Sequence, residues 1–294
     1  MHPTSDQEPA RQPSHPDDAA HRLQAILASP SYRLAIEDPD YMRRDELRPS
    51  RLALEYLKPE LILEEHGIVS TIVVFGGTRI AEPHEARARV HELESMLRDD
   101  PGNPELERRL AIARRVLAKS HYYEVARDFS ALVSRQRQHD GQPDFVIITG
   151  GGPGIMEAAN RGAHDVGAKS IGLNITIPHE QVPNSYITPD LCFLFRYFAI
   201  RKMHFMKRAQ ALVAFPGGYG TLDELFEALT LVQTRKVRPL PIILCGRDFW
   251  SGALNLEYLA DEGTINPEDL DLFRYAETAE EIWKQIRSFH ALPD

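Results

Sequence analysis

The sequence has few cysteines and no long apolar run. Its two cysteines, Cys192 and Cys245, each stand in or beside a strand-like apolar run, which favours buried free thiols over a disulfide or a metal site. No apolar stretch has the length needed to cross a bilayer, and the N-terminus lacks the apolar core of a secretory signal. These absences argue against a disulfide-rich secreted scaffold and a membrane protein, and we expect a cytoplasmic protein.

Positive charge is also scarce. The chain has 34 Lys and Arg residues against 43 Asp and Glu residues, which gives a formal net charge of −9. Nucleic acids and anionic membranes require a clustered basic surface, so neither is an expected partner. Any phosphate bound by this chain must be held locally, by a few side chains and backbone N–H groups.

Residue patterning divides the 294 residues into three segments. Residues 1–18 hold four prolines among polar residues and are expected to form a disordered tail. Residues 19–66 carry apolar positions at helical spacing and predict a helical extension. Residues 67–294 alternate strand-like and helical stretches, which predicts an α/β fold with a doubly wound, Rossmann-like parallel sheet. Its strands are expected near residues 71–75, 145–149, 170–175, 191–196, 211–215 and 241–245.

The gap between the first two predicted strands is too long for one crossover helix. Residues 82–138 show helical spacing on both sides of the breaker at residues 99–104, so we expect an inserted helical hairpin. Its many Arg and Glu residues indicate a solvated face. Together with the helical extension it has more apolar surface than one sheet face covers, so at least a homodimer is expected.

Three glycine-rich turns follow predicted strands. They are Gly76-Gly77-Thr78-Arg79, residues 150–154 (Gly-Gly-Gly-Pro-Gly), and residues 216–220 (Pro-Gly-Gly-Tyr-Gly). Parallel strands end at one edge of a sheet, where α/β proteins bind ligands. Consecutive N–H groups in such turns, next to a helix start, suit a phosphate. The sequence therefore predicts a nucleotide site at this edge.

The third turn has two interpretations. Thr221 and Glu224 have the spacing of a capping box, in which both side chains would only satisfy N–H groups at the start of a helix. Alternatively, Glu224 faces the ligand held by the turn. The residues of this motif alone leave both open.

Two adjacent cations, Arg201 and Lys202, stand between the second and third turns. The order Gly-Gly-Gly-Pro-Gly-Ile-Met-Glu, Arg-Lys and Pro-Gly-Gly-Tyr-Gly-Thr-Leu-Asp-Glu resembles the Lonely Guy (LOG) family, often misnamed lysine decarboxylases. The resemblance covers roughly residues 70–290, and the last element is highly specific to the family and its near relatives.

The resemblance implies a phosphoribohydrolase. Such an enzyme cleaves the N-glycosidic bond of AMP or of a cytokinin riboside 5′-monophosphate, giving a free base and ribose 5-phosphate without a cofactor. The family's catalytic residues fall on Arg201 and Glu224. The expected substrate-binding residues, from the turns and the resemblance together, are Gly76, Gly77, Gly151, Gly152, Glu180, Lys202, Gly217, Gly218, Tyr219, Gly220, Thr221 and Thr230.

These residue types suit the reaction. Breaking a ribosyl C–N bond builds positive charge on the sugar, so a carboxylate such as Glu224 can stabilise that charge and orient or deprotonate water. The departing base gains negative charge, and the permanently charged Arg201 can serve either the base or the phosphate. No set of His, Cys and Asp residues has metal-ligand spacing near the site, and His179 and His204 are expected to be solvated or satisfied imidazoles.

Three features depart from the short members of the family: the N-terminal segment, the hairpin, and a first turn that has Thr78 and Arg79 in place of a serine-bearing turn. The leading alternative is a non-catalytic protein that binds a nucleotide or molybdenum cofactor. A pyridoxal-phosphate decarboxylase is not expected, because this sequence has no lysine in a context that would form a Schiff base with the cofactor. A dinucleotide-binding dehydrogenase is not expected either, because the Gly-x-Gly-x-x-Gly fingerprint is not met.

Overall fold

The computed structural model describes residues 16–139, 142–178 and 182–292. The chain divides into two compact units, Met1–Ala53 and Leu54–Asp294. None of the helices in the described residues has the length and apolar composition needed to cross a membrane. Both cysteines are free thiols, Cys245 buried and Cys192 partly buried.

The first unit is made of short helical segments. They are α1 (Pro16–Ala28), η1 (Pro30–Tyr32), η2 (Ala35–Glu37), α2 (Pro39–Met42), η3 (Asp45–Leu47) and the first residues of α3 (Arg48–Glu65). Asp38 caps α2 by accepting hydrogen bonds from the N–H groups of Asp40 and Tyr41. The predicted apolar stripe of α1, formed by Leu23, Ile26 and Leu27, is 55% exposed at each residue. The predicted disordered tail lies outside the described residues except for residues 16–18, which begin α1.

The second unit is built on a seven-stranded parallel sheet of order β6-β5-β4-β1-β7-β8-β9. The strands are β1 (Thr71–Phe75), β4 (Val146–Thr149), β5 (Ser170–Ile175), β6 (Cys192–Phe195), β7 (Ala209–Ala214), β8 (Ile242–Cys245) and β9 (Phe273–Ala276). The chain builds the sheet outward from β1 on one side and returns to place β7 on the other. This confirms the predicted doubly wound fold and puts its switch point at β1.

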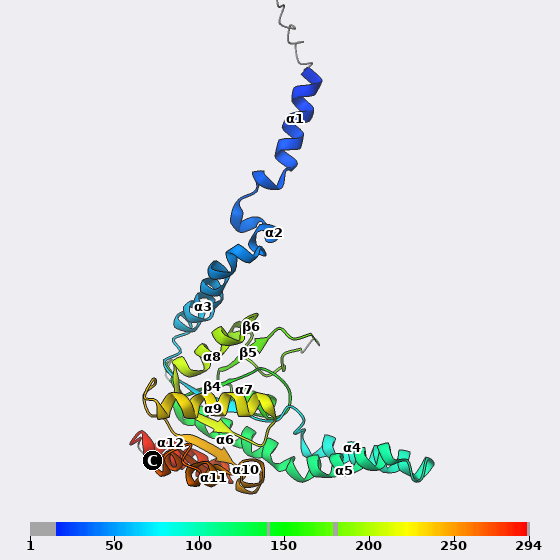
Figure 1. Ribbon diagram of the computed structural model, residues 1–294, viewed down its shortest axis with the longest axis vertical. Coiled ribbons are helices and arrows are strands. Elements are labelled where there is room, and N and C mark those ends of the chain that lie inside the picture. The colour runs from blue at the N-terminus through cyan, green and yellow to red at the C-terminus, as the bar shows by residue number, and fades with distance from the viewer. Residues whose placement is uncertain (1–15, 140–141, 179–181, 293–294) are drawn as a thin grey trace, which may run out of the picture. The chain divides into compact units, whose positions relative to one another are not determined.

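Helices cover both faces of the sheet (Figure 1). Side chains of β1 alternate between the two apolar cores, Ile72 and Val74 in one and Val73 and Phe75 in the other. The first core is completed by α6 (His121–Arg137), α7 (Ile155–Asp165) and α12 (Ala279–Phe289). The second is completed by α3, α8 (Phe198–Lys207), α9 (Tyr219–Gln233) and α10 (Arg247–Ala253). The remaining helical segments are η4 (Pro189–Leu191), α11 (Leu256–Asp261) and η5 (Pro267–Leu272).

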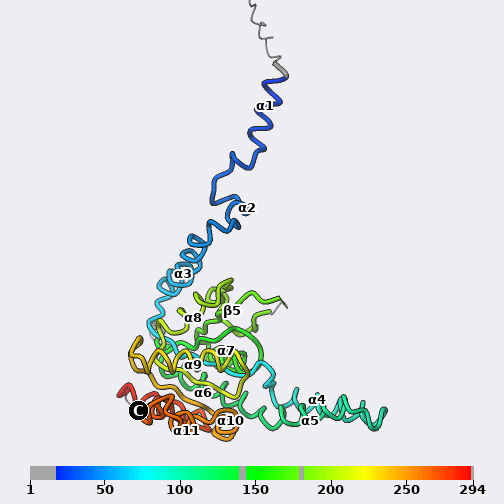
Figure 2. Tube along the Cα trace, viewed as in Figure 1, coloured from blue at the N-terminus to red at the C-terminus, as the bar shows by residue number. Residues whose placement is uncertain are grey.

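The inserted segment between β1 and β4 contains a helical hairpin. Its helices α4 (Pro83–Asp99) and α5 (Pro104–Lys119) run side by side away from the sheet (Figure 2). They share a small core formed by Val90, Leu93, Leu106, Leu110 and Ala113. The third helix of the segment, α6, is the crossover helix that packs on the sheet.

Three strands, β9, β2 (Gln138–His139) and β3 (Gln142–Pro143), were not predicted. Strand β9 at the sheet edge is only four residues long and half-buried, so it carries a weak apolar signal. A two-stranded antiparallel pair, formed by β2 and β3, lies outside the main sheet. Each of its strands has two residues, too few to give a periodic pattern.

The close packing of α6 on α7 depends on Gly162. A Cβ at this position would overlap the carbonyl oxygen of Arg127 and lie 2.8 Å from the Cβ of Ser130. We expect Gly162→Ala to lower the free energy of unfolding by ~1–3 kcal/mol, because overpacking forces the helices apart. The matched change Gly252→Ala on α10, where a Cβ meets no atom within 4 Å, should cost far less. Urea unfolding measures both, and equal stability of the two variants would contradict the packing argument.

Candidate functional site

The three glycine-rich turns meet at the carboxyl ends of β4, β1 and β7, which are adjacent strands. The N–H of Gly77 in the first turn donates to the carbonyl of Pro216 in the third, at 2.8 Å. The N–H of Ile155, which follows the second turn, approaches the carbonyl of Gly77 at 3.3 Å. The first turn is therefore bonded to both others, and the predicted gathering of the turns at one edge is confirmed.

The second turn is held by a buried polar network. Gly151 and Gly154 have φ angles of 73° and 74°, a region that side-chain-bearing residues rarely adopt. The hydroxyl of Thr149 accepts from the N–H of Gly151 (3.0 Å) and donates to Asn160 Oδ1 (2.7 Å). Asn184 Nδ2 donates to the same Asn160 oxygen at 2.9 Å. Sequence reasoning missed these amides, because residues 160 and 184 become neighbours only when the sheet forms.

The third turn opens into α9, which starts two residues before the predicted cap. Its N-cap is Gly218, and no side chain forms a cap hydrogen bond there. Thr221 and Glu224 lie inside the helix and are buried. The capping-box interpretation of Glu224 is therefore wrong. A Cβ at Gly218 or Gly220 would meet no described atom within 4 Å, so the space above the first N–H groups of α9 is open.

Arg201 lies on α8 and reaches back to the sheet edge. Its Nε donates to the carbonyl of Leu173 in the second half of β5 (2.8 Å), and its guanidinium lies 5.2 Å from the ring centre of Phe205. A Cβ on Gly150 would come 2.5 Å from Arg201 Nη2, so the second turn needs glycine where the guanidinium rests. Burial lowers the pKa of Arg201 against the opposing effect of Glu224, but a guanidinium stays charged.

Glu224 is a buried carboxyl group on the first turns of α9, 7% exposed. Burial raises its pKa to about 7, against the opposing effects of the cations Lys202 and Arg201. The acidic neighbours Glu227 and Asp223 raise it further. Near neutral pH the group is therefore present in both protonation states, which suits a group that takes up and releases a proton.

Lys202 pairs with two carboxylates of α9. Its Nζ lies 2.8 Å from Asp223 Oδ1 and 3.0 Å from Glu227 Oε2. Burial acts to lower the pKa of Lys202, but the hydrogen bonds to Asp223 and Glu227 outweigh this effect, so the pKa is raised. An open hollow of about 550 Å³ lies here, lined by Lys202, Tyr219, Leu222, Asp223, Phe226, Glu227, Thr230 and Leu231. The hydroxyl of Thr230 donates to the carbonyl of Phe226 within the helix at 2.7 Å.

Two larger hollows lie beside β8 and β9, with volumes of about 670 and 770 Å³. Neither is lined by a residue of the glycine-rich turns, nor by Arg201 or Glu224. The chemistry-bearing groups gather instead at the edge formed by the turns.

The predicted site residues fall into two groups. The glycines at 76, 77, 151, 152, 217, 218 and 220, with Tyr219 and Thr221, belong to the turns and the start of α9, the helix that carries Glu224. Lys202 and Thr230 line the hollow beside α9. Glu180 and His179 lie outside the described residues. His204 is buried on α8 and faces Glu60 of α3, whose Oε1 lies 3.0 Å from its Nδ1.

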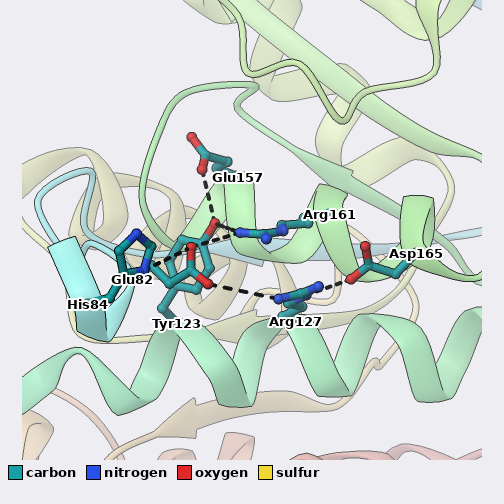
Figure 3. Close-up of polar contacts among 7 residues, drawn as sticks. All are labelled: Glu82, His84, Tyr123, Arg127, Glu157, Arg161 and Asp165. Carbon is teal, nitrogen blue, oxygen red and sulfur yellow. Dashed lines mark hydrogen bonds and ion pairs between the residues drawn. The ribbon is translucent and has the colours of Figure 1, made fainter.

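A second set of polar contacts ties α7, the helix after the second turn, to its neighbours (Figure 3). Tyr123 of α6 donates to Glu157 Oε1 at 2.9 Å, and Arg161 Nη1 donates to Glu82 Oε2 at 2.9 Å. Burial raises the pKa of Tyr123, so its hydroxyl keeps the proton it donates. Glu157, the last residue of the second glycine motif, therefore anchors its helix through this contact. Sequence reasoning gave it no role.

Residues 16–139, 142–178 and 182–292 contain no group of three or more His, Cys, Asp or Glu side chains placed to hold a metal ion. The charged groups at the turns in this part of the chain include Arg201, Lys202, Glu224, the acidic neighbours of Lys202, and Arg79 of the first turn. This arrangement provides a buried acid–base group, fixed positive charge and open backbone N–H groups, the components of electrostatic and proton-transfer catalysis on a phosphorylated ligand.

Comparison with known proteins places these features in a family. The sequence model described as "Possible lysine decarboxylase" matches residues 156–286. The cytokinin riboside 5′-monophosphate phosphoribohydrolase LOG3 of Arabidopsis thaliana is 30% identical over 177 residues, which cover 58% of this chain and 77% of that protein. LOG4 of the same plant is 29% identical over 149 residues, 49% of this chain and 67% of that protein.

Solved structures with a similar fold include two proteins that bind molybdenum cofactor. The molybdenum cofactor binding protein of Rippkaea orientalis is 18% identical, with a TM-score of 0.41, over 57% of this chain and 88% of that one. The Moco carrier protein of Chlamydomonas reinhardtii is 15% identical, with a TM-score of 0.44, over 76% of this chain and 98% of that one. The sequence identity to LOG3, over more than two thirds of that protein, is the decisive likeness, and this chain belongs to the LOG family.

Proposed function

We propose that this protein hydrolyses the N-glycosidic bond of a nucleoside 5′-monophosphate, AMP or a cytokinin riboside 5′-monophosphate, to a free base and ribose 5-phosphate. The names of its relatives LOG3 and LOG4 support this reaction class. The presence of Arg201, Lys202 and Glu224 together at the glycine-rich turns also supports it.

Glu224 is the observation that carries the proposal. A carboxyl group with a pKa raised to about 7 by burial, beside two cations and at the edge of an anion-binding turn, fits a general base better than a structural residue. It makes no hydrogen bond to the start of its helix, so its burial is not explained by capping.

The chemistry follows from these groups. The bond between C1′ of the ribose and the base nitrogen breaks, and its electron pair leaves with the base. The Glu224 carboxylate stabilises the positive charge that develops at C1′ and takes a proton from the water whose oxygen bonds to C1′. That proton is passed on by Glu224, directly or through solvent, to the base nitrogen that was bonded to the sugar. The guanidinium of Arg201 supplies fixed positive charge for the departing base or for the phosphate.

The glycine-rich turns supply positioning. In this proposal the 5′-phosphate rests on the open N–H groups at the start of α9, where the helix dipole favours an anion. Holding the phosphate fixes the ribose beside Glu224 and lowers the entropic part of the barrier. A carrier of molybdenum cofactor or of a nucleotide has no need of a carboxylate with this pKa at the site, which favours the enzyme.

A panel of nucleoside monophosphates, with release of ribose 5-phosphate measured, tests the function and identifies the base. We expect AMP or an N6-substituted AMP to be cleaved and adenosine to react far more slowly, because adenosine lacks the group that the turns bind. Binding of a nucleotide without release of ribose 5-phosphate would instead support a carrier. Equal kcat/KM for AMP and adenosine would refute the phosphate-binding role of the turns.

Replacing Glu224 by glutamine tests its role as base and charge stabiliser. Glu224→Gln keeps the shape of the side chain but removes its charge and basicity, so we expect kcat to fall by roughly 10²-fold or more with little change in Tm. The exposed Glu280→Gln on α12 is the control and should keep wild-type turnover. Turnover within a few-fold of wild type in Glu224→Gln would remove the central residue of the mechanism.

The pH dependence gives a separate test. The reaction needs the Glu224 carboxylate, and its pKa of about 7 means that the active form is lost as pH falls through about 7. We expect kcat/KM to decline on the acidic side of neutrality, far above the ordinary range for a carboxyl group. A profile flat from pH 8 down to about 5 would show that no group with the raised pKa of Glu224 controls the reaction.

A further inference from the structure

Two carboxylates of α3 hold the helix that carries Arg201 and Lys202. The part of α3 concerned, from Leu54 onward, belongs to the same compact unit as α8. At the start of α8, Glu55 Oε1 accepts hydrogen bonds from the N–H groups of Arg196 and Tyr197, both at 2.8 Å. One carboxylate oxygen thus binds two consecutive N–H groups where the helix has no side-chain cap of its own.

Glu60 binds the other end of α8. It accepts from Lys207 Nζ at 2.6 Å and from Arg208 Nη1 at 2.8 and 2.9 Å, and it faces the buried His204. Burial disfavours the charged carboxylate of Glu60 and acts to raise its pKa. The hydrogen bonds from Arg208 and Lys207 outweigh this effect, so the pKa of Glu60 is lowered. Burial also lowers the pKa of His204, which favours the neutral ring. The cations that pair with Glu60 are therefore Lys207 and Arg208.

Aromatic and apolar contacts complete the attachment. Lys207 donates to the hydroxyl of Tyr56 at 2.6 Å and lies 4.8 Å from the centre of its ring. The rings of Tyr56 and His204 are 5.2 Å apart. Leu63 of α3 and Phe205 of α8 belong to the same buried core. Helix α8 is therefore fixed at both ends and along one side.

These contacts determine where the cations of α8 point. A helix of ten residues held at both ends has one rotational setting about its axis. In that setting Arg201 reaches the carbonyl of Leu173 and Lys202 reaches Asp223 and Glu227. A rotation or a shift of about 1 Å would move both cations away from Glu224, and displacements of this size reduce rates by up to about 10²-fold.

We propose that Glu60 and Glu55 are positioning residues, which fix α8 so that Arg201 and Lys202 stand beside Glu224. This inference rests on the proposed function. It predicts that the α3 carboxylates act on the reaction without touching the substrate, and that their loss changes the titration of Glu224 as well as the rate. A contact that only added stability would leave the Glu224 titration where it is.

The experiment compares wild type with Glu60→Gln, using Glu64→Gln as the matched control. Glu64 lies one turn further along α3, is exposed, and its side chain makes no hydrogen bond or ion pair with the described residues. The pKa of Glu224 is read from side-chain carboxyl ¹³C shifts of the protein labelled at glutamate and assigned with Glu224→Gln. Release of ribose 5-phosphate from the best nucleotide is followed in parallel, well below the Tm of each variant.

We expect Glu60→Gln to raise the Glu224 pKa, because the cations that lower it move away, and to reduce kcat about 10-fold or more. Glu64→Gln should match wild type in both. Glu55→Ala, which removes the acceptor at the other end of α8, should act like Glu60→Gln, whereas Glu55→Gln keeps an acceptor oxygen and should restore wild-type behaviour. This second pair carries the test if Glu60→Gln does not fold.

The outcomes separate the inference from the proposed function. Wild type that releases no ribose 5-phosphate sinks the proposed function, while the ¹³C titration still reports the position of α8. Folded Glu60→Gln and Glu55→Ala proteins with an unchanged Glu224 pKa overturn the positioning role, even if turnover falls.

Discussion

The hydrogen bond from Arg201 Nε to the carbonyl of Leu173 links the catalytic candidates to the sheet. It holds the start of α8 against β5 and places the guanidinium where Gly150 leaves room. Lys202, the next residue, then faces the acidic side of α9, which contains Asp223 and Glu227. The fit of the guanidinium against the glycine turn and of Lys202 against α9 thus depends on this bond, together with the attachment of α8 to α3.

Opposing effects set the proton affinity of Glu224. Burial and the neighbouring carboxylates favour the neutral acid, whereas Lys202 and Arg201 favour the carboxylate. The result, a pKa near 7, lies in the range where a group can both accept and release protons in a neutral solution. Because the cations belong to α8 and the carboxyl to α9, this balance depends on how the two helices pack.

Much of the site is readable in the sequence, because its parts are local. A strand followed by glycines and a helix is a contiguous pattern, so the three turns and their shared edge followed from the residues, and Arg201, Lys202 and Glu224 followed from a motif. The local interpretation of Glu224 as a cap was wrong, since α9 begins at Tyr219 and takes Gly218 as its N-cap.

What the sequence did not reveal depends on distant pairs. Glu55 and Tyr197, or Glu60 and Arg208, have no shared periodicity, and only the packing of α3 on the sheet brings them together. The same holds for the buried amide of Asn160, whose partners come from other elements. Strand β9 was missed for a different reason, because a short, half-exposed edge strand carries little apolar signal.

The hairpin α4–α5 differs from the sheet in how far apart along the sequence its contacting residues lie. Its core brings together residues from Val90 to Ala113, neighbours in the chain, whereas Thr71 of β1 must find Val146 of β4 before the first strand pair forms. Contacts between close neighbours need little loop closure and form fastest. We therefore expect the hairpin to complete its core before β1 pairs with β4, and a folded hairpin shortens the effective loop that this pairing must close.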